Sequence, residues 1–123
     1  MAELVRDINK FEYDGLIGGT NPPIFTKNVV IVSGAGKLVR GTVLGQITAS
    51  KKYKTVNSTS EDGSQVAKAV LAYPVDATST DIVATVYWSG PFNRKKLIFG
   101  GTDTADTHED ALRDVNILLT SQQ

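Results

Sequence analysis

The sequence predicts a mainly β, β-rich α+β fold: a small sandwich-like or barrel-like domain with a short C-terminal helix and an extended N-terminal arm. Residues 29–32 are four consecutive β-branched side chains, which suit a pleated sheet. Residues 82–89 alternate between two faces, as a strand requires. Gly, Pro and polar turns separate short apolar segments of this kind, and a length of 123 residues fits one domain.

The first part of the chain differs from the rest. Residues 1–20 are predicted to form the arm, and residues 21–123 the β-rich domain. Apolar side chains in the arm follow a rough helical spacing, with charged residues between them. Two interpretations stay open: a disordered leader, and an arm that orders against a partner. The candidate partner-binding residues are Leu4, Val5, Ile8, Phe11, Tyr13, Leu16 and Ile17.

Two strand regions are expected next. A strand is predicted over 24–32, and a hairpin turn over 33–37, where glycines tolerate positive φ. A second strand region is expected over 38–48. Its glycines, Gly41 and Gly45, predict a bulge, a bend or a close backbone neighbour. The apolar positions of this region that share one alternation are Val39, Val43 and Ile47.

The middle of the chain is predicted to alternate between strands and polar loops. Residues 66–73 are rich in Ala and Val, and we expect a buried strand there rather than a short helix. Asp62-Gly63 is a turn signal. The other elements expected here are a short strand at 53–56 and polar loops at 57–64 and 75–80.

Residues 82–89 give the clearest strand of the sequence. One of its faces is apolar throughout, which predicts that Trp88 is buried. Gly90-Pro91 predicts a turn after this strand. A basic loop at 93–96 and a short apolar strand at 97–99 are expected to follow. The apolar face consists of Ile82, Ala84, Val86 and Trp88.

The C-terminal segment is expected to begin with a helix. Asp106 and Glu109 are three positions apart, as in a capping pair. Residues 115–120 fit either the end of this helix or a terminal strand, and the pattern leaves both open. The apolar positions that fit a helical stripe are Ala111, Leu112, Val115, Leu118 and Leu119.

Composition excludes several kinds of chemistry. Cysteine is absent, so thiolate metal sites and cysteine nucleophiles are excluded. The chain has 13 Lys+Arg and 13 Asp+Glu, so no net basic field favours direct binding of nucleic acid. Neither a signal peptide nor an 18-residue apolar stretch is visible, and we expect no membrane contact. Residues 34–37 resemble part of a phosphate-binding loop, but Ile31 and Leu38 stand where a glycine and a Ser or Thr are required.

No catalytic, metal or cofactor-binding set is predicted. His108 is the one histidine, and it lies among Asp103, Asp106, Glu109 and Asp110. We expect these residues to cap the helix, since carboxylates in a first helical turn are favoured by the helix dipole. A G-x-S-x-G element is absent. The sequence therefore predicts a protein that is not an enzyme.

Two basic clusters, at 51–54 and 94–96, have several open interpretations. They fit a solubilising turn, protection of an edge strand, or contact with an acidic protein surface. Each of these is favoured over contact with nucleic acid, because the net charge of the chain is zero.

Several sequence pieces occur together in a fixed order. The first is an aromatic-and-leucine segment with Gly and Pro before the first strand: Tyr13, Leu16, Gly19 and Pro23. The central motif residues are Arg40, Gly41, Thr42, Val43, Leu44, Gly45, Asp62 and Gly63. Further pieces follow in order: Val70-Leu71-Ala72, Val75-Asp76-Ala77 and the strand from Ile82 to Gly90. With these pieces the chain resembles, over about residues 13–119, the head decoration proteins of tailed bacteriophages, the family of the lambda-type capsid-stabilising protein.

This resemblance implies a structural virion protein. Members of the family form homotrimers on the outside of the expanded capsid, at local three-fold positions, and stabilise it against internal DNA pressure. The implied partner is the major capsid protein, contacted by the N-terminal arm. The implied location is the capsid exterior, after synthesis in the cytoplasm of the bacterial host. The resemblance transfers no catalytic residue.

A second hypothesis comes from the aromatic and basic residues. A small β-barrel module for carbohydrate or nucleic acid would need an exposed aromatic platform beside the basic loops. The aromatic residues available for it are Tyr53, Tyr73, Tyr87 and Trp88. Burial of Trp88 would remove the best of them.

Overall fold

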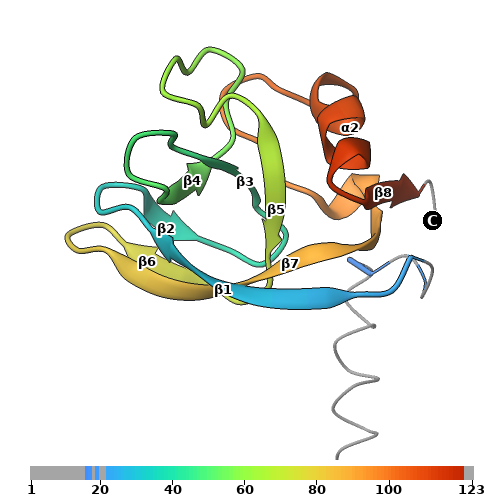
Figure 1. Cartoon of the computed structure of the whole chain (residues 1–123), viewed down its shortest axis with the longest axis horizontal. Helices are drawn as coiled ribbons and strands as arrows, with labels where there is room; N and C mark the ends of the chain where they lie inside the picture. Colours follow the sequence, from blue (N-terminus) through green and yellow to red (C-terminus); the bar gives the residue numbers. More distant parts are fainter. Residues whose placement is uncertain (1–15, 18, 20–21, 121–123) are drawn as a thin grey trace, which may run out of the picture.

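The computed structural model describes residues 16–17, 19 and 22–120, and its dominant feature is a closed five-stranded β-barrel. The barrel order is β1-β4-β3-β5-β7, and pairing of β1 with β7 closes it (Figure 1). Strand β8 is added to β7 in parallel. The barrel strands are β1 (Phe25–Ile31), β3 (Val43–Gln46), β4 (Tyr53–Thr55), β5 (Ala67–Leu71) and β7 (Ile82–Asn93).

The other elements lie around the barrel. Strands β2 and β6 form a separate antiparallel pair, and α2 lies outside the sheet near β5 and β8 (Figure 1). None of the helices in the described residues is long and apolar enough to span a bilayer. The bounds of these elements are β2 (Gly36–Leu38), β6 (Val75–Ala77), the 3₁₀ turn η1 (Arg94–Lys96), α2 (Ala105–Asp114) and β8 (Ile117–Thr120).

Alternation along the strands produces two apolar cores. On β7, Ala84 and Val86 face the barrel interior, whereas Tyr87 faces outward beneath α2. We call the cluster inside the barrel the inner core: Val29, Ile31, Leu38, Leu44, Tyr53, Ala69, Leu71, Ala77, Ala84 and Val86. We call the cluster between sheet and helix the outer core: Leu16, Val43, Val56, Ala67, Val70, Ala72, Tyr87, Phe92, Leu97, Leu112 and Ile117.

The predicted strands at 24–32, 53–56, 66–73 and 82–89 are confirmed by β1, β4, β5 and β7. The hairpin prediction at 33–37 is wrong, because β1 pairs with β4 and β7 and the turn leads into β2, whose partner is β6. Residues 75–80 were expected to be only a loop, but they contain β6.

The region 38–48 divides into two short strands at Gly41. Gly41 has a φ of 95°, which bends the chain between β2 and β3. Val39 is consequently 51% exposed while Val43 is fully buried, so the predicted common face for these residues is wrong. The close backbone neighbour predicted for the glycines is confirmed at Gly45, where an added Cβ would collide with the Ser64 backbone.

The predicted turn at Gly90-Pro91 is wrong. Strand β7 continues to Asn93, because β8 and an antiparallel bridge from Ile17 pair with its last residues. Gly90 tolerates its φ of 139° within this strand. The predicted strand at 97–99 is reduced to a single bridge between Ile98 and Thr42.

The C-terminal helix is confirmed, but its cap differs from the prediction. Helix α2 begins after Thr104, and the Thr107 hydroxyl accepts a hydrogen bond from the Thr104 backbone N–H at 3.1 Å. Asp106 and Glu109 therefore lie inside the helix rather than at its cap. Asn116, with a φ of 69°, follows the helix, and residues 117–120 form β8 instead of a further helical turn.

Candidate functional site

The motif residues around Arg40 build the fold. The Arg40 guanidinium donates hydrogen bonds to the Ala72 carbonyl at 3.1 Å and to the Tyr87 hydroxyl, and it lies 5.3 Å from the centre of the Tyr87 ring. At Gly41, an added Cβ would come within 2.8 Å of the Lys96 carbonyl oxygen. These contacts connect the bend before β3 to β5, β7 and η1, so their role is structural.

The rest of the motif attaches the loop at 57–64 to β3. The Asp62 carboxylate accepts hydrogen bonds from the Ser64 hydroxyl and, at 3.0 Å, from the Ser64 backbone N–H. Hydrogen bonding by Ser64 lowers the pKa of Asp62. Gly63 has a φ of 106°, and Gly45 packs directly against Ser64. Thr42, Val43 and Leu44 complete the motif as buried residues.

His108 connects α2 to two loops. Its Nε2 lies 2.7 Å from the Asp103 carboxylate, and its ring stacks on Phe99 at 5.6 Å between ring centres. Asp103 also accepts hydrogen bonds from the Ser58 backbone N–H and hydroxyl, each at 2.6 Å. The predicted capping role is thus replaced by a buried contact between the loops and α2. The described residues contain no group of three or more potential metal ligands.

The described chain enters the domain beside the end of β7. Leu16 is 2% exposed and belongs to the outer core, and its carbonyl accepts a hydrogen bond from the Asn93 N–H at 2.7 Å. Ile17 bridges Phe92 on the side of β7 opposite β8. The other candidate arm residues, Leu4, Val5, Ile8, Phe11 and Tyr13, lie outside the described residues.

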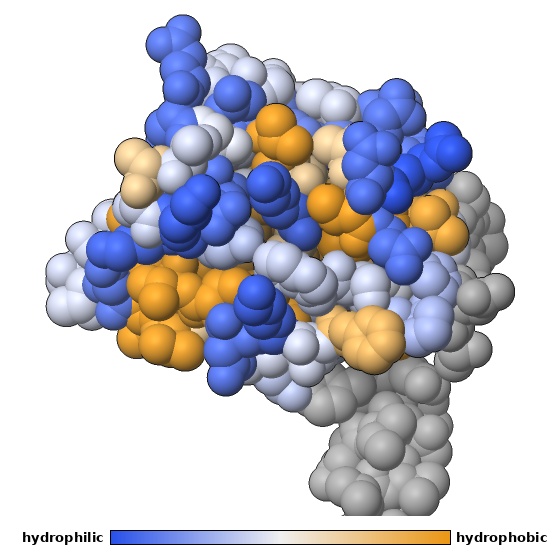
Figure 2. Space-filling view, viewed as in Figure 1, coloured by the Kyte–Doolittle hydropathy of each residue, from blue (hydrophilic) through white to orange (hydrophobic). Residues whose placement is uncertain are grey.

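Exposed apolar side chains surround this entry point. Phe25, at the start of β1, is 61% exposed and pairs with Ser89, and Leu118 of β8 is 39% exposed and pairs with Pro91. Both therefore flank the stretch of β7 that precedes Phe92. We call Phe25 and Leu118 the entry face. Figure 2 shows a further apolar area over β6 and the adjoining end of β1.

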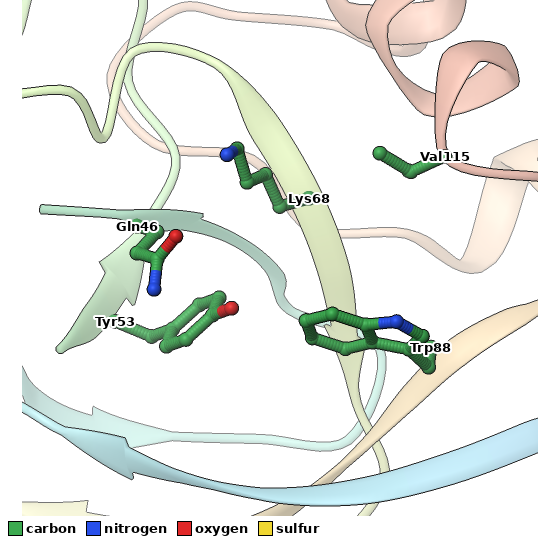
Figure 3. A pocket seen from close by; sticks show the side chains of 5 residues that line it. All are labelled: Gln46, Tyr53, Lys68, Trp88 and Val115. Carbon is green, nitrogen blue, oxygen red and sulfur yellow. The ribbon is translucent and has the colours of Figure 1, made fainter. Parts of the chain in front are cut away.

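A small pocket lies where β3, β4, β5 and β7 end near α2. Its volume is about 270 Å³, and Figure 3 shows its lining residues: Gln46, Tyr53, Lys68, Trp88 and Val115. Trp88 is 37% exposed, so the prediction that it is buried is wrong. It lies on the interior face of β7 at the open end of the barrel, where Tyr53 contacts it edge-on at 6.5 Å between ring centres. The Lys27 ammonium lies 4.5 Å from the indole centre.

Some of the basic side chains at 51–54 and 94–96 form ion pairs with acidic residues. Lys54 pairs with Asp62 at 3.7 Å, and Arg94 pairs with Glu109 at 2.7 Å. Lys52 pairs with Asp81. Because Lys52 and Lys54 are partly solvent-exposed, these pairs contribute little to stability, and they reduce the positive charge available to a polyanion.

Comparison with known proteins identifies the family to which the chain belongs. A family profile described as bacteriophage lambda head decoration protein D matches residues 7–118 of the 123. The chain belongs to this head decoration protein family. A search of curated proteins gives no significant match. The resemblance stated from the sequence is thereby confirmed, and membership of this family supports a structural role in decorating the phage capsid.

The structure of this decoration protein also shows what sequence reasoning missed. Gln46 and Lys68 were not selected from the sequence, yet they meet Tyr53 and Trp88 in the pocket. The sequence signal that pointed to this site was the alternation along β7, which places Trp88 on the same face as Ala84 and Val86. What the alternation does not reveal is that the barrel opens at this level and leaves the indole partly exposed.

Proposed function

We propose that this decoration protein is a homotrimer that binds the outside of the expanded capsid at local three-fold positions and stabilises it against internal DNA pressure. The protein is made in the host cytoplasm and contacts the major capsid protein. The observation that carries the proposal is the family match, which spans nearly the whole described domain and part of the arm. A mechanical role of this kind needs binding surfaces and no reactive group.

In this proposal, the segment that precedes Leu16 makes the contact with the capsid. The arm was predicted over residues 1–20. Leu16 and Ile17 pack against the domain, and in this proposal residues 1–15 are the part that contacts the capsid. Each backbone hydrogen bond to a capsid strand contributes about 0.5–1.5 kcal/mol. Each buried large apolar side chain contributes about 1.5–3 kcal/mol. The candidate anchors are Leu4, Val5, Ile8, Phe11 and Tyr13.

The entry face supports the direction of this contact. Phe25 and Leu118 leave apolar surface exposed at the end of the barrel where the arm begins. A capsid surface that binds the arm therefore also lies within reach of these side chains. Three arms on one trimer act together through effective concentration, so weak individual contacts suffice for stable attachment.

Truncation tests the proposal. The variant lacking residues 2–15 retains Leu16 and should remain a trimer by light scattering, but it should no longer sediment with expanded capsids. A variant with Lys37→Met, a change at an exposed position of β2, whose strand partner is β6, is the matched control and should bind as the full chain does. Capsid binding by the truncated protein, or a monomeric full-length protein at tens of micromolar, would contradict the proposal.

A further inference from the structure

The pocket containing Trp88 offers a set of groups that the decoration role does not use. Its lining combines an indole, a phenol, an amide and an ammonium group, contributed by the four barrel strands β7, β4, β3 and β5 (Figure 3). Apolar walls with a few convergent polar groups are the usual composition of a small-molecule site. Among the described residues, no acidic side chain lines this pocket.

The Tyr53 hydroxyl is the most informative of these groups. The Tyr53 side chain is 4% exposed, and its hydroxyl points toward Trp88, into the space that the lining side chains surround (Figure 3). Among the described residues it has no hydrogen-bond partner. Burial raises the pKa of the Tyr53 phenol, which keeps it a neutral hydroxyl able to donate and to accept. A hydroxyl in this position, which solvent reaches, can hydrogen-bond to a polar ligand that enters the pocket.

The neighbouring groups define the charge of the ligand. Lys68 lines the pocket and forms no ion pair with any described residue, so its ammonium is available to an anion. Gln46 donates its amide N–H to the Lys51 carbonyl at 3.2 Å, which leaves its side-chain oxygen as an acceptor. Lys27, over the Trp88 ring, adds positive charge nearby. The site thus combines an anion-binding group with both a donor and an acceptor for hydroxyls.

Size and surface restrict the ligand further. A volume of about 270 Å³ is slightly smaller than the ~300–1,000 Å³ of common ligand pockets, so it fits a single ring. The exposed part of the indole supplies an apolar surface for one face of that ring.

We propose that the pocket formed by Tyr53, Lys68, Trp88 and Gln46 binds one acidic sugar, a hexuronate ring whose carboxylate pairs with Lys68. The ring packs on Trp88, and its hydroxyls bond to Tyr53 and Gln46. This inference goes beyond capsid attachment: it gives the decorated shell a site for acidic glycans. It develops the carbohydrate alternative from the sequence, whose required exposed aromatic is present at Trp88.

The single tryptophan makes the test direct. D-glucuronate is titrated into the full-length protein while Trp88 emission is followed, with heat of binding as a second readout. Saturable binding is expected, together with at least about tenfold weaker binding of neutral methyl glucoside, since a charge-assisted hydrogen bond is lost. If no saturable signal is seen up to about 10 mM D-glucuronate, the proposal is wrong, because the dissociation constant would then be too high for specific binding of this sugar.

Two conservative variants test the assigned contacts. Lys68→Met keeps the side-chain length and should weaken D-glucuronate binding about tenfold or more, and Tyr53→Phe should weaken it about fivefold. Lys95→Met should bind D-glucuronate normally. If the Lys68 and Tyr53 variants bind as tightly as the unchanged protein, or if acetate competes as well as D-glucuronate, the assignment is wrong.

The variant lacking residues 2–15 should retain glucuronate binding, so failure of the glucuronate proposal and failure of the capsid proposal are distinguishable.

Discussion

The inner core lies inside a closed sheet, whereas the outer core lies between that sheet and segments from both ends of the described chain. Every inner-core residue falls between Val29 and Val86. The outer core instead joins Leu16 at one end to Leu112 and Ile117 at the other. Phe92 is at their meeting point, fully buried, with Ile17 bridged on one side and β8 paired on the other.

The inner core and the outer core therefore have different structural roles. The inner core closes the barrel and leaves the Trp88 pocket at its open end. The outer core fixes the first described residues of the chain against β7 and α2. Stress applied to the arm would therefore reach the domain through the outer core. Damage to the two cores should then have different consequences for capsid binding.

The largest expected effect comes from Phe92→Ala. Removal of this buried ring should lower the free energy of unfolding by about 3–5 kcal/mol, and it should also weaken capsid binding because Leu16 and Ile17 lose packing in the outer core. Urea unfolding and capsid sedimentation measure the two effects.

Leu71→Ala is the matched inner-core change, with an expected loss of about 2–5 kcal/mol. Under conditions where the variant remains folded, its capsid binding should be unchanged. Equal losses of capsid binding in the Phe92 and Leu71 variants would remove the distinction between the cores.

Leu16→Ala should have the next largest effect. Leu16 is buried in the outer core close to the start of the described chain, so we expect a loss of about 2 kcal/mol, at the low end for Leu→Ala. Leu4→Ala is the comparison: it should leave the unfolding free energy unchanged and weaken sedimentation with capsids. If Leu4→Ala and Leu16→Ala lowered the unfolding free energy equally, the assignment of residues 1–15 to capsid contact and of Leu16 to the domain would be wrong.

A pH-dependent effect is expected at the contact between the outer layer and the loop at 57–64. The Ser58 side chain, and then His108, hold the pKa of Asp103 below its usual value. The stabilisation is therefore fully present above the unfolded pKa of about 3.9 and is lost as pH falls through the lower folded pKa. Asp103→Asn should lower the Tm at neutral pH.

The difference in Tm between the Asp103→Asn variant and the unchanged protein should shrink as the pH falls below about 4. Ser58→Ala should show a smaller difference with the same trend, because His108 still contacts Asp103. A Tm difference that is constant between about pH 2 and pH 6 would contradict the assigned role of Asp103.

The smallest expected effect is at the pocket. Lys27→Met removes the cation over Trp88 and should cost about 0.5–1 kcal/mol of unfolding free energy. Trp88 emission should shift, while capsid binding should not change. An unaltered emission spectrum would show that Lys27 does not occupy this position in solution.

The inner core was largely predictable from the sequence, and the outer core was not. Alternation identified Ala84 and Val86 as one face, and the β-branched run identified β1, because these signals are local. Gly90-Pro91 read as a turn because its strand partners are far away in the sequence, at Ile117 and Leu118. Strand β6, which adds Ala77 to the inner core, is the exception, because a strand of three residues gave no periodic signal of its own.

The candidate sites follow the same division. The motif at residues 40–45 was recognised from its sequence, but its role in bending and packing the chain became visible only through Ala72, Tyr87 and Ser64. The pocket escaped prediction because its lining comes from separate strands, and apolar patterning assigned Trp88 to the interior without showing where the barrel opens.

Electron cryo-microscopy of expanded heads of the parent phage, incubated with the full-length chain, tests the central claim most directly. The account predicts three copies around each local three-fold position on the outer surface, with the entry face toward the shell and residues before Leu16 in contact with capsid subunits. Single copies, or copies attached through the opposite end of the barrel with their N-terminal segments directed away from the shell, would contradict it.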